Sequence, residues 1–425
     1  MREISFKNLK SILQENLISQ TNQQVAKTVS AIIEDVRKNR DKALLKYIKK
    51  FENKNATLSN LVIKPKSLKE AYNGITKNQR EALNLAYDRI NFYHNHQVKK
   101  NFKFKDKLDT TFSIKWNPIE TVGLYIPGGL ASYPSTVLMT SIPARIAGVK
   151  NIMISVPSSD GKVSKLTLAA AHLCKVNKVY NMGGAQAIAA FAFGTTIIQK
   201  AHKVFGPGNQ FVAEAKKQLF GTIGIDLPAG PSEILVLADK FSKPNLIASD
   251  ILAQAEHDPN AKTYLVSTCK NIIKKVIQNI QKIQKDHKFK NADASLKNFS
   301  YAILAKNSSK MIEISNFIAP EHLHVHMKDT SQIEQNIVNA GSVFIGEQNA
   351  VALGDYSIGT NHVLPTDQSA KYSSGLSLDD FVKKTVFVRV GKKTFSKIAD
   401  KTIELAKSEG LDAHALSIEL RVSKS

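Results

Sequence analysis

The sequence predicts an α/β protein with two successive parallel-sheet halves, a short N-terminal arm and a small C-terminal tail. Three observations support this fold class. From Thr121 onward, short apolar segments with strand character alternate with helical segments of about 10 to 15 residues, the pattern of βαβ units. The alternation is divided once, near the segment IDLPAGPSE (225–233). The first hundred or so residues carry helical periodicity instead.

The N-terminal region begins with an amphipathic arm over residues 1–20, which is too polar to be a secretory signal. Long helices are expected over residues 25–48 and 78–92, where apolar residues recur at helical spacing. The lysine-rich segment 101–112 is expected to be a connector or an exposed strand.

The first half is expected to contain five strands and four helices in alternation. The predicted strands are 121–127, 151–157, 178–184, 203–209 and 222–230, and the predicted helices are 135–149, 166–176, 185–194 and 211–220.

The second half repeats this alternation. Its predicted strands are 233–239, 263–268, 300–306, 323–327 and 342–346, and its predicted helices are 245–258, 272–285, 314–319 and 331–340. The tail contains a strand at 383–390 and two helices. It is too small to fold alone, so we expect it to pack on something else, such as another subunit.

Composition narrows the class of protein. Hydrophobic residues make up 43% of the chain, and no apolar run is long enough to span a bilayer. The two cysteines cannot form a disulfide framework and suit a reducing compartment, so we expect a cytoplasmic protein without a membrane partner.

The net charge of +23 leaves nucleic-acid binding as an alternative, which would show as steeply salt-dependent affinity. However, only 8 of the 59 basic residues are arginine, and the lysines are scattered without interleaved aromatic residues. A solvated lysine surface with no nucleic-acid partner is therefore the expectation.

Glycine-containing turns follow three predicted strands of the first half: 127–129 (PGG), 183–184 (GG) and 206–208 (GPG). The dinucleotide fingerprint GxGxxG is absent. Tight βα turns need glycine in any case, but three at the carboxyl edge of one sheet favour a nucleotide or another anionic ligand.

Ligand-type residues are concentrated in the second half. Gln254 and His257 are three residues apart and would share a helix face, and Asp355 lies in a glycine-flanked loop. These could contribute to a zinc-type site, although a lone histidine on a helix is more often structural. Glu321 and His322 lie at a helix-to-strand junction and provide a carboxylate beside an imidazole, suited to acid–base chemistry.

Other histidines and the cysteines have simpler explanations. On a strand, His322, His324 and His326 would share one face, which suits a metal cluster, or only one of them would be functional. His94 and His96 are expected at the surface. Catalysis by a thiol of Cys174 or Cys269 is an alternative, but neither has a strand-end context beside a base.

The segments GLYIPGG, NMGGAQAIAA, FGPGN, IDLPAGPSE, QAEHD, APEHLHV, GDYSIGTNHVLPT and EGLDAHALSI occur in an order that resembles the histidinol dehydrogenase family, from about residue 20 to the end. The resemblance implies two incomplete Rossmann-like, aldehyde-dehydrogenase-like domains. It implies oxidation of L-histidinol to L-histidine through L-histidinal, with two NAD+, one zinc ion per site and a homodimer whose active sites are shared.

The resemblance also implies residue roles. His322 would be the general base and Glu321 would activate water. The implied zinc ligands are Gln254, His257, Asp355 and His414, the last from the partner subunit. The implied substrate contacts are Ser232, Gln254, His257, His322, Asp355, Glu409 and His414, with His362 nearby, and the implied NAD contacts are Tyr125, Gln186 and Asn209.

With the resemblance, the domain boundaries become an arm at 1–20, an α/β domain of 21–112 with 233–376 that carries the metal ligands and catalytic pair, an NAD-contacting domain at 113–232, and a tail at 377–425 that packs on the partner. His324 and His326 depart from the family motif and could form an additional metal site.

Overall fold

The structure is a computed structural model that describes residues 1–19, 23–128, 132–158, 161–227, 230–287, 289 and 291–422. Contacts divide the chain into two compact units. The larger unit contains residues 1–97 and 119–381, and the smaller contains residues 98–118 and 382–425.

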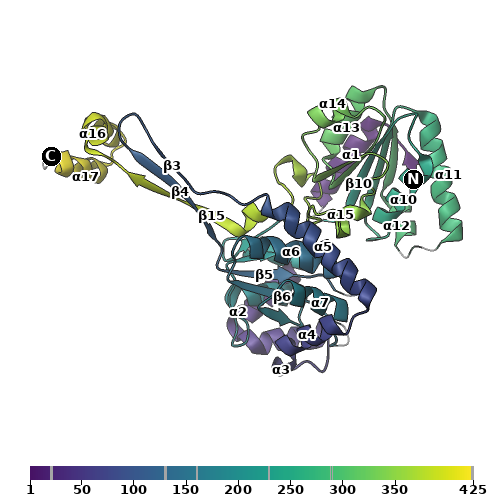
Figure 1. Cartoon of the computed structure of the whole chain (residues 1–425), viewed down its shortest axis with the longest axis horizontal. Coiled ribbons are helices and arrows are strands. Elements are labelled where there is room, and N and C mark those ends of the chain that lie inside the picture. The colour runs from purple at the N-terminus through teal and green to yellow at the C-terminus, as the bar shows by residue number, and fades with distance from the viewer. Residues whose placement is uncertain are drawn as a thin grey trace. The chain divides into compact units, whose positions relative to one another are not determined.

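The larger unit contains two six-stranded sheets, each covered by helices (Figure 1). In the first sheet the strands are parallel except for β2. Their order is β2 (Val62–Ile63), β7 (Lys178–Tyr180), β6 (Asn151–Ser155), β5 (Thr121–Tyr125), β8 (Lys203–Phe205) and β9 (Gly224–Ile225).

Helices cover both faces of the first sheet because its strands are apolar on both sides. One hydrophobic cluster involves α2 (Gln23–Phe51), α8 (Gly184–Phe193) and α9 (Gln210–Leu219). The other involves α4 (Pro65–Asn73), α5 (Lys77–Asn95), α6 (Pro134–Ile146) and α7 (Lys165–Leu173). The short α3 (Leu58–Leu61) precedes β2.

The second sheet is parallel throughout. Its order is β1 (Arg2–Glu3), β12 (Ser300–Leu304), β11 (Lys262–Ser267), β10 (Glu233–Ala238), β13 (His322–His326) and β14 (Ser342–Ile345). One face packs on α10 (Pro244–Ala255), α11 (Lys270–Asp286) and α12 (Ala292–Asn298). The other packs on α1 (Phe6–Ser19), α13 (Ser308–Ile318) and α14 (Ser331–Asn336). The short α15 (Ala352–Tyr356) and two 3-10 turns, Ser369–Lys371 and Leu378–Phe381, follow.

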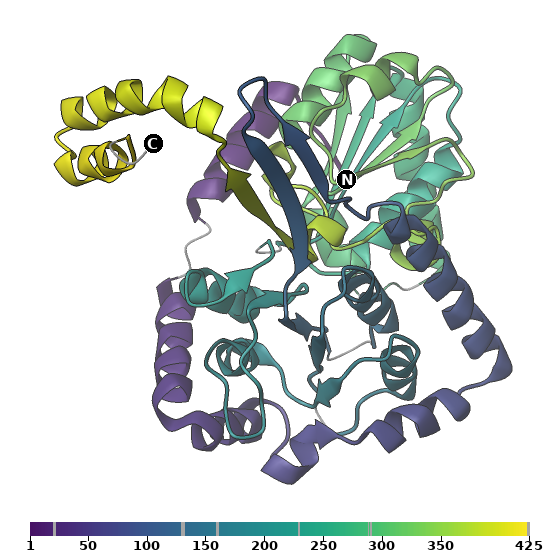
Figure 2. The ribbon, with the colours of Figure 1, turned by 60° about the vertical axis from the view of Figure 1, so that its left-hand side comes forward.

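The smaller unit is an antiparallel sheet followed by a helical pair (Figure 2). Its strands are β15 (Val382–Arg389), β4 (Thr111–Pro118) and β3 (Phe102–Lys105), in that order. The helices are α16 (Lys392–Ser408) and α17 (Asp412–Val422), which pack on each other. The lysine-rich segment 101–112 was expected to be a connector or an exposed strand, and the structure shows that it contributes to strands.

The described residues confirm the α/β class and the order of the strands and helices, but the N-terminal region packs differently from the predicted grouping. Residues 1–19 belong to the second sheet, where β1 pairs with β12 and Leu9 is buried. Helix α2 packs on α8 and α9 of the first sheet, because its apolar face, with Val29 and Val36, matches theirs. None of the helices in the described part of the chain is long and apolar enough to cross a membrane.

Candidate active site

The catalytic pair predicted from sequence lies where two neighbouring strands of the second sheet begin. Strands β10 and β13 pair in parallel, with Ile234 opposite His322. Glu233 is the first residue of β10 and Glu321 directly precedes β13, so the two residues lie side by side at the same edge. This is the N-terminal edge of the sheet, whereas ligands of open parallel sheets usually bind at the carboxyl edge.

Glu321 is a buried carboxyl group held by the backbone. Glu321 is only 6% exposed, and its Oε2 accepts a hydrogen bond of 2.8 Å from the backbone N–H of Glu233. Burial raises the pKa of Glu321 well above its usual value, and the charges of Glu233, Asp355 and Asp367 add to this. A carboxylate with a raised pKa is a stronger base than an ordinary one.

His322 is oriented so that one ring nitrogen is fixed as the donor. Its Nδ1 lies 3.0 Å from the carbonyl oxygen of Glu233, which can only accept, so Nδ1 carries the hydrogen. The lone pair is then on Nε2. Burial lowers the pKa of His322, which favours the neutral imidazole. The side chain is therefore prepared to accept a proton at Nε2.

Asp355 brings two histidines toward His322. Its Oδ2 lies 4.0 Å from Nε2 of His257, and its Oδ1 lies 4.0 Å from Nδ1 of His362. The pKa of His322 responds to Asp355, His257 and His362, so all four groups are within electrostatic range. His362 is held on both nitrogens, by the carbonyl oxygen of Asp355 at 3.0 Å and the hydroxyl of Thr136 at 3.2 Å.

Gln254 and His257 are close in sequence but do not share a helix, contrary to expectation. Helix α10 ends at Ala255, and His257 lies in the turn that follows, with its N–H donating to the carbonyl of Gln254 at 3.3 Å. Gln254 is 4% exposed, in the last turn of the helix, whereas the His257 side chain is 40% exposed. The helix face that the spacing predicts therefore ends before His257.

An ionic cluster that sequence reasoning missed lies beside the predicted catalytic pair. Lys262 forms ion pairs with Glu233, at 3.0 Å, and with Asp367. Burial opposes the charge of Lys262, but the two carboxylates outweigh it and raise its pKa. The three residues come from β10, β11 and a distant loop, so no local sequence signal could have grouped them.

The glycine turns of the first sheet gather at one edge, as predicted, with Gly129 outside the described residues. At this edge Tyr125 ends β5, and its hydroxyl accepts a hydrogen bond of 3.2 Å from the N–H of Gly184 at the start of α8. Glu52, at the end of α2, accepts hydrogen bonds from the N–H of Gly183 at 3.0 Å and from the side chain of Gln186 at 2.8 Å. Burial raises the pKa of Glu52 to about 7.

Two further positions at this edge depend on backbone conformation. Asn209 caps α9, and its side chain accepts from the N–H groups of Phe211 and Val212. Gly206 has a φ of 109°, and a Cβ there would lie 2.0 Å from the carbonyl oxygen of Tyr125. Only glycine permits this close approach of the two strand ends.

The remaining predicted positions lie elsewhere in the two units. Ser232 directly precedes β10, beside Glu233 of the catalytic edge. Glu409 and His414 belong to the smaller unit, at the end of α16 and near the start of α17, where they line a hollow with Leu405 and Leu411.

Comparison with known proteins shows which family has this arrangement. The sequence profile described as histidinol dehydrogenase matches residues 16–422. The chain belongs to the histidinol dehydrogenase family. A histidinol dehydrogenase of Pelagibacter ubique is 42% identical over 98% of both chains, and one of Clostridium acetobutylicum is 42% identical over 94% of this chain and 93% of that one. The crystal structure of histidinol dehydrogenase from Elizabethkingia anophelis superposes with a TM-score of 0.90 at 36% identity, covering 95% of this chain and 94% of that one.

Membership of the histidinol dehydrogenase family confirms the resemblance found in the sequence and the expected class of enzyme, an oxidoreductase. Cys174 is a poor candidate for thiol catalysis, because it is fully buried and burial raises its pKa to about 12.

One minor expectation is wrong for this histidinol dehydrogenase family member. His94 is not at the surface: it is fully buried, and its Nε2 lies 3.3 Å from the amide nitrogen of Asn361. His94 thereby anchors the loop that carries His362. His96 is exposed, as expected.

Proposed function

We propose that the chain catalyses the NAD-dependent, four-electron oxidation of L-histidinol to L-histidine through L-histidinal. The observation that carries the proposal is the pairing of Glu321 with a His322 whose Nε2 is free to accept a proton. Both are buried beside Asp355 and His257 in a histidinol dehydrogenase family member.

Zinc fits the donors gathered at this edge. A carboxylate oxygen and an imidazole nitrogen on one zinc ion are about 3.3 Å apart, given bond lengths of roughly 2.0–2.1 Å. The 4.0 Å between Asp355 Oδ2 and His257 Nε2 is close to this, and the half-exposed His257 can move inward. Gln254 and the partner subunit's His414 would complete the set. When bound, zinc orients the imidazole and amine of histidinol.

The protein side chains carry the proton transfers. In the first oxidation, the substrate C–H transfers a hydride to NAD+ while His322 Nε2 takes the hydroxyl proton, which gives the aldehyde. Glu321 then removes a proton from the water that attacks the aldehyde carbon. The protonated His322 returns its proton to the aldehyde oxygen, so the neutral hydrate forms. The hydrate then transfers a hydride to a second NAD+ while His322 Nε2 takes a hydroxyl proton, and the carboxylic acid releases its last proton to solvent to give the carboxylate of histidine.

NAD is assigned to the edge formed by Tyr125, Gln186 and Asn209. The Gly206 turn supports this placement, because it leaves no side chain where the backbone of β5 and β8 would approach a dinucleotide. Ser232, Glu409 and the shared metal ligands would contact the substrate.

A homodimer is supported by apolar side chains that the smaller unit leaves exposed. Val388, Leu405 and Leu420 are 56%, 65% and 55% exposed. Apolar patches of this kind usually mark an interaction surface. A second copy of the chain is the partner that would both cover them and place His414 at the zinc site.

The test is NADH formation from limiting L-histidinol, measured before and after chelation and again after zinc is restored. We expect two NADH per histidinol, lost with the metal and regained with zinc. A folded, zinc-loaded protein that forms no NADH would refute the proposed substrate.

The variant Glu321→Gln should slow the second oxidation more than the first, because the amide cannot activate water but still accepts the hydrogen bond from the N–H of Glu233. L-histidinal should therefore accumulate, and an aldehyde-trapping reagent measures it. Equal slowing of both steps, with no trapped aldehyde, would contradict the assignment.

Glu52 predicts a pH-dependent stability. Its pKa is raised in the folded chain from 4.5 to about 7, so folding favours the neutral carboxyl group. This stabilisation is complete below pH 4.5 and is lost as the pH rises through 7, a difference of roughly 3 kcal/mol. The variant Glu52→Gln should lack that loss. Urea unfolding of both proteins at a series of pH values measures it, and parallel curves would contradict the prediction.

A further inference from the structure

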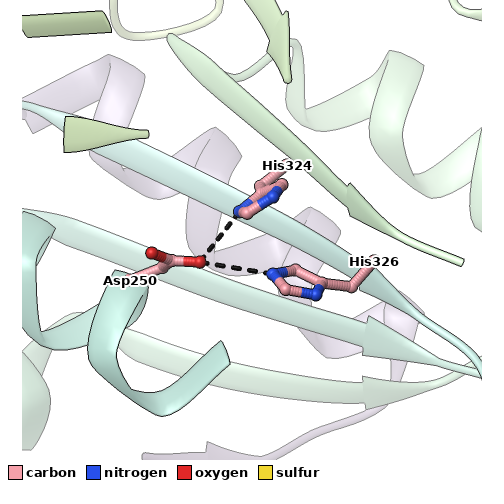
Figure 3. Close-up of side chains that lie close together, drawn as sticks. All are labelled: Asp250, His324 and His326. Atoms are coloured by element: carbon pink, nitrogen blue, oxygen red, sulfur yellow. Dashed lines mark hydrogen bonds and ion pairs between the residues drawn. The ribbon is translucent and has the colours of Figure 1, made fainter. Parts of the chain in front are cut away.

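A second cluster of ligand-type side chains lies close to the proposed zinc site, on the same helix and strand. Asp250 is one turn before Gln254 on α10, and His324 is two residues after His322 on β13. Figure 3 shows Asp250 reaching from the helix toward His324 and His326, which point to it from the neighbouring strand. Alternation along β13 puts both imidazoles on the face that packs against α10.

The spacing of the three ligand atoms fits a common metal ion. Asp250 Oδ2 lies 2.9 Å from Nδ1 of His324 and 3.3 Å from Nε2 of His326. Among the described residues, this is the group of His, Cys, Asp and Glu side chains whose three ligand atoms all lie within 4.8 Å of one another. Ligands of a tetrahedral zinc ion are separated by about 3.3 Å, so little movement is needed.

The hydrogen bonding of His324 leaves a lone pair directed into this cluster. Its Nε2 lies 3.1 Å from the carbonyl oxygen of Gly346, so Nε2 carries the hydrogen and Nδ1 of the neutral ring is an acceptor. Nδ1 is buried and has no hydrogen-bond partner, although Asp250 Oδ2 is 2.9 Å away. The two acceptor atoms can stay in contact only with a proton on Nδ1, which makes the ring an imidazolium, or with a metal ion between them. A metal-bound histidine typically donates its other N–H to a carbonyl group, as His324 does.

Burial strengthens the need for a cation. His324, His326 and Asp250 are 0%, 3% and 8% exposed, so water offers little solvation to the carboxylate. Two imidazole nitrogens and one carboxylate oxygen are the ligand types that zinc and similar divalent ions prefer.

We propose that Asp250, His324 and His326 bind a divalent transition-metal ion of the zinc class, at a site separate from the catalytic one. The ion joins α10, which carries Gln254, to β13, which carries His322. It therefore fixes the spacing between the helix end and the strand end that form the active site. The inference rests on this cluster alone and does not depend on the proposed function.

The experiment is metal analysis of the full-length protein after loading with Zn2+ and removal of unbound ion. His326→Gln and Asp250→Asn remove one ligand each with little change in volume, and His257→Asn removes a proposed catalytic ligand. His202→Gln alters an exposed histidine as the matched control. We expect His326→Gln, Asp250→Asn and His257→Asn each to lose one zinc equivalent per chain, and His202→Gln to lose none.

The zinc equivalents that each variant loses distinguish the proposed catalytic zinc site from the proposed second site. If the catalytic zinc is wrong but the second site is right, His257→Asn loses nothing and His326→Gln loses the only equivalent. If wild-type protein binds one equivalent that His326→Gln and Asp250→Asn retain, the second site is refuted.

If His326→Gln and Asp250→Asn both fail to fold, His257→Asn still tests the second site, because it leaves Asp250, His324 and His326 intact. Loaded with Co2+, it should show the visible absorption of an ion bound by histidine nitrogen. Absence of this absorption would refute the proposed second metal site.

Discussion

Replacing His322 by Asn should reduce kcat by roughly 10²- to 10⁴-fold, the range expected for loss of a positioned general base. The amide nitrogen of Asn can take the place of Nδ1 and donate to the carbonyl of Glu233, so the strand edge should remain intact. What is lost is the lone pair of Nε2, which no atom of Asn replaces. Steady-state NADH formation measures the change.

The zinc content and NAD affinity of this variant show whether it has lost a base or a ligand. Zinc content and NAD affinity should stay at the wild-type level, since His322 is not among the residues proposed to bind zinc or NAD. His202→Asn, at an exposed histidine, is the matched control and should retain full activity. A His322→Asn protein with near-normal kcat would eliminate His322 as the base. Parallel loss of zinc would instead indicate a metal-ligand role.

Mixing two inactive variants should restore activity if the active sites are shared between subunits. His414→Asn lacks a zinc ligand, and Glu321→Gln lacks the group that activates water. In a mixed dimer, one site receives Glu321 from the first variant and His414 from the second, and the other site receives both defects. Random re-association of equal amounts should give about a quarter of the wild-type sites. Histidine formation after denaturation and renaturation of the mixture measures this recovery.

The control is each variant renatured alone, which should form almost no histidine. His414 lies on α17 in the smaller unit, whereas Glu321 lies in the larger unit, so we expect the His414 substitution to leave the local structure around Glu321 unchanged. No recovery in a mixture that contains mixed dimers would show that each site is built from one chain.

Local sequence patterns were sufficient for the class of fold and for part of the site. The alternation of strand and helix segments from Thr121 onward matches the observed order of elements, because hydrophobic periodicity reports which face of each segment is buried. The glycine turns gather at one sheet edge because parallel strands all end there. The adjacent pair Glu321 and His322 needed no long-range information, since the two residues are neighbours in the chain.

The packing of the N-terminal region was beyond these patterns. The amphipathic face of α2 shows that this helix is buried against something, but not against which sheet. Its apolar residues fit α8 and α9, and the strand Arg2–Glu3 adds to the other sheet. Periodicity does not identify the partner of a buried face, and the predicted grouping of residues 21–112 with the second half came from the family resemblance.

By itself, then, the sequence determined the α/β class and the family, and it predicted which residues would act as metal ligands, acid and base. Only the tertiary structure decided that Glu321 and His322 lie at the N-terminal edge of β10 and β13 and that Glu52 reaches Gln186. It also decided that Asp250 meets His324 and His326. These contacts join residues more than seventy positions apart. Such contacts arise from strand pairing and helix packing, which depend on the whole chain and leave no signature in any short segment.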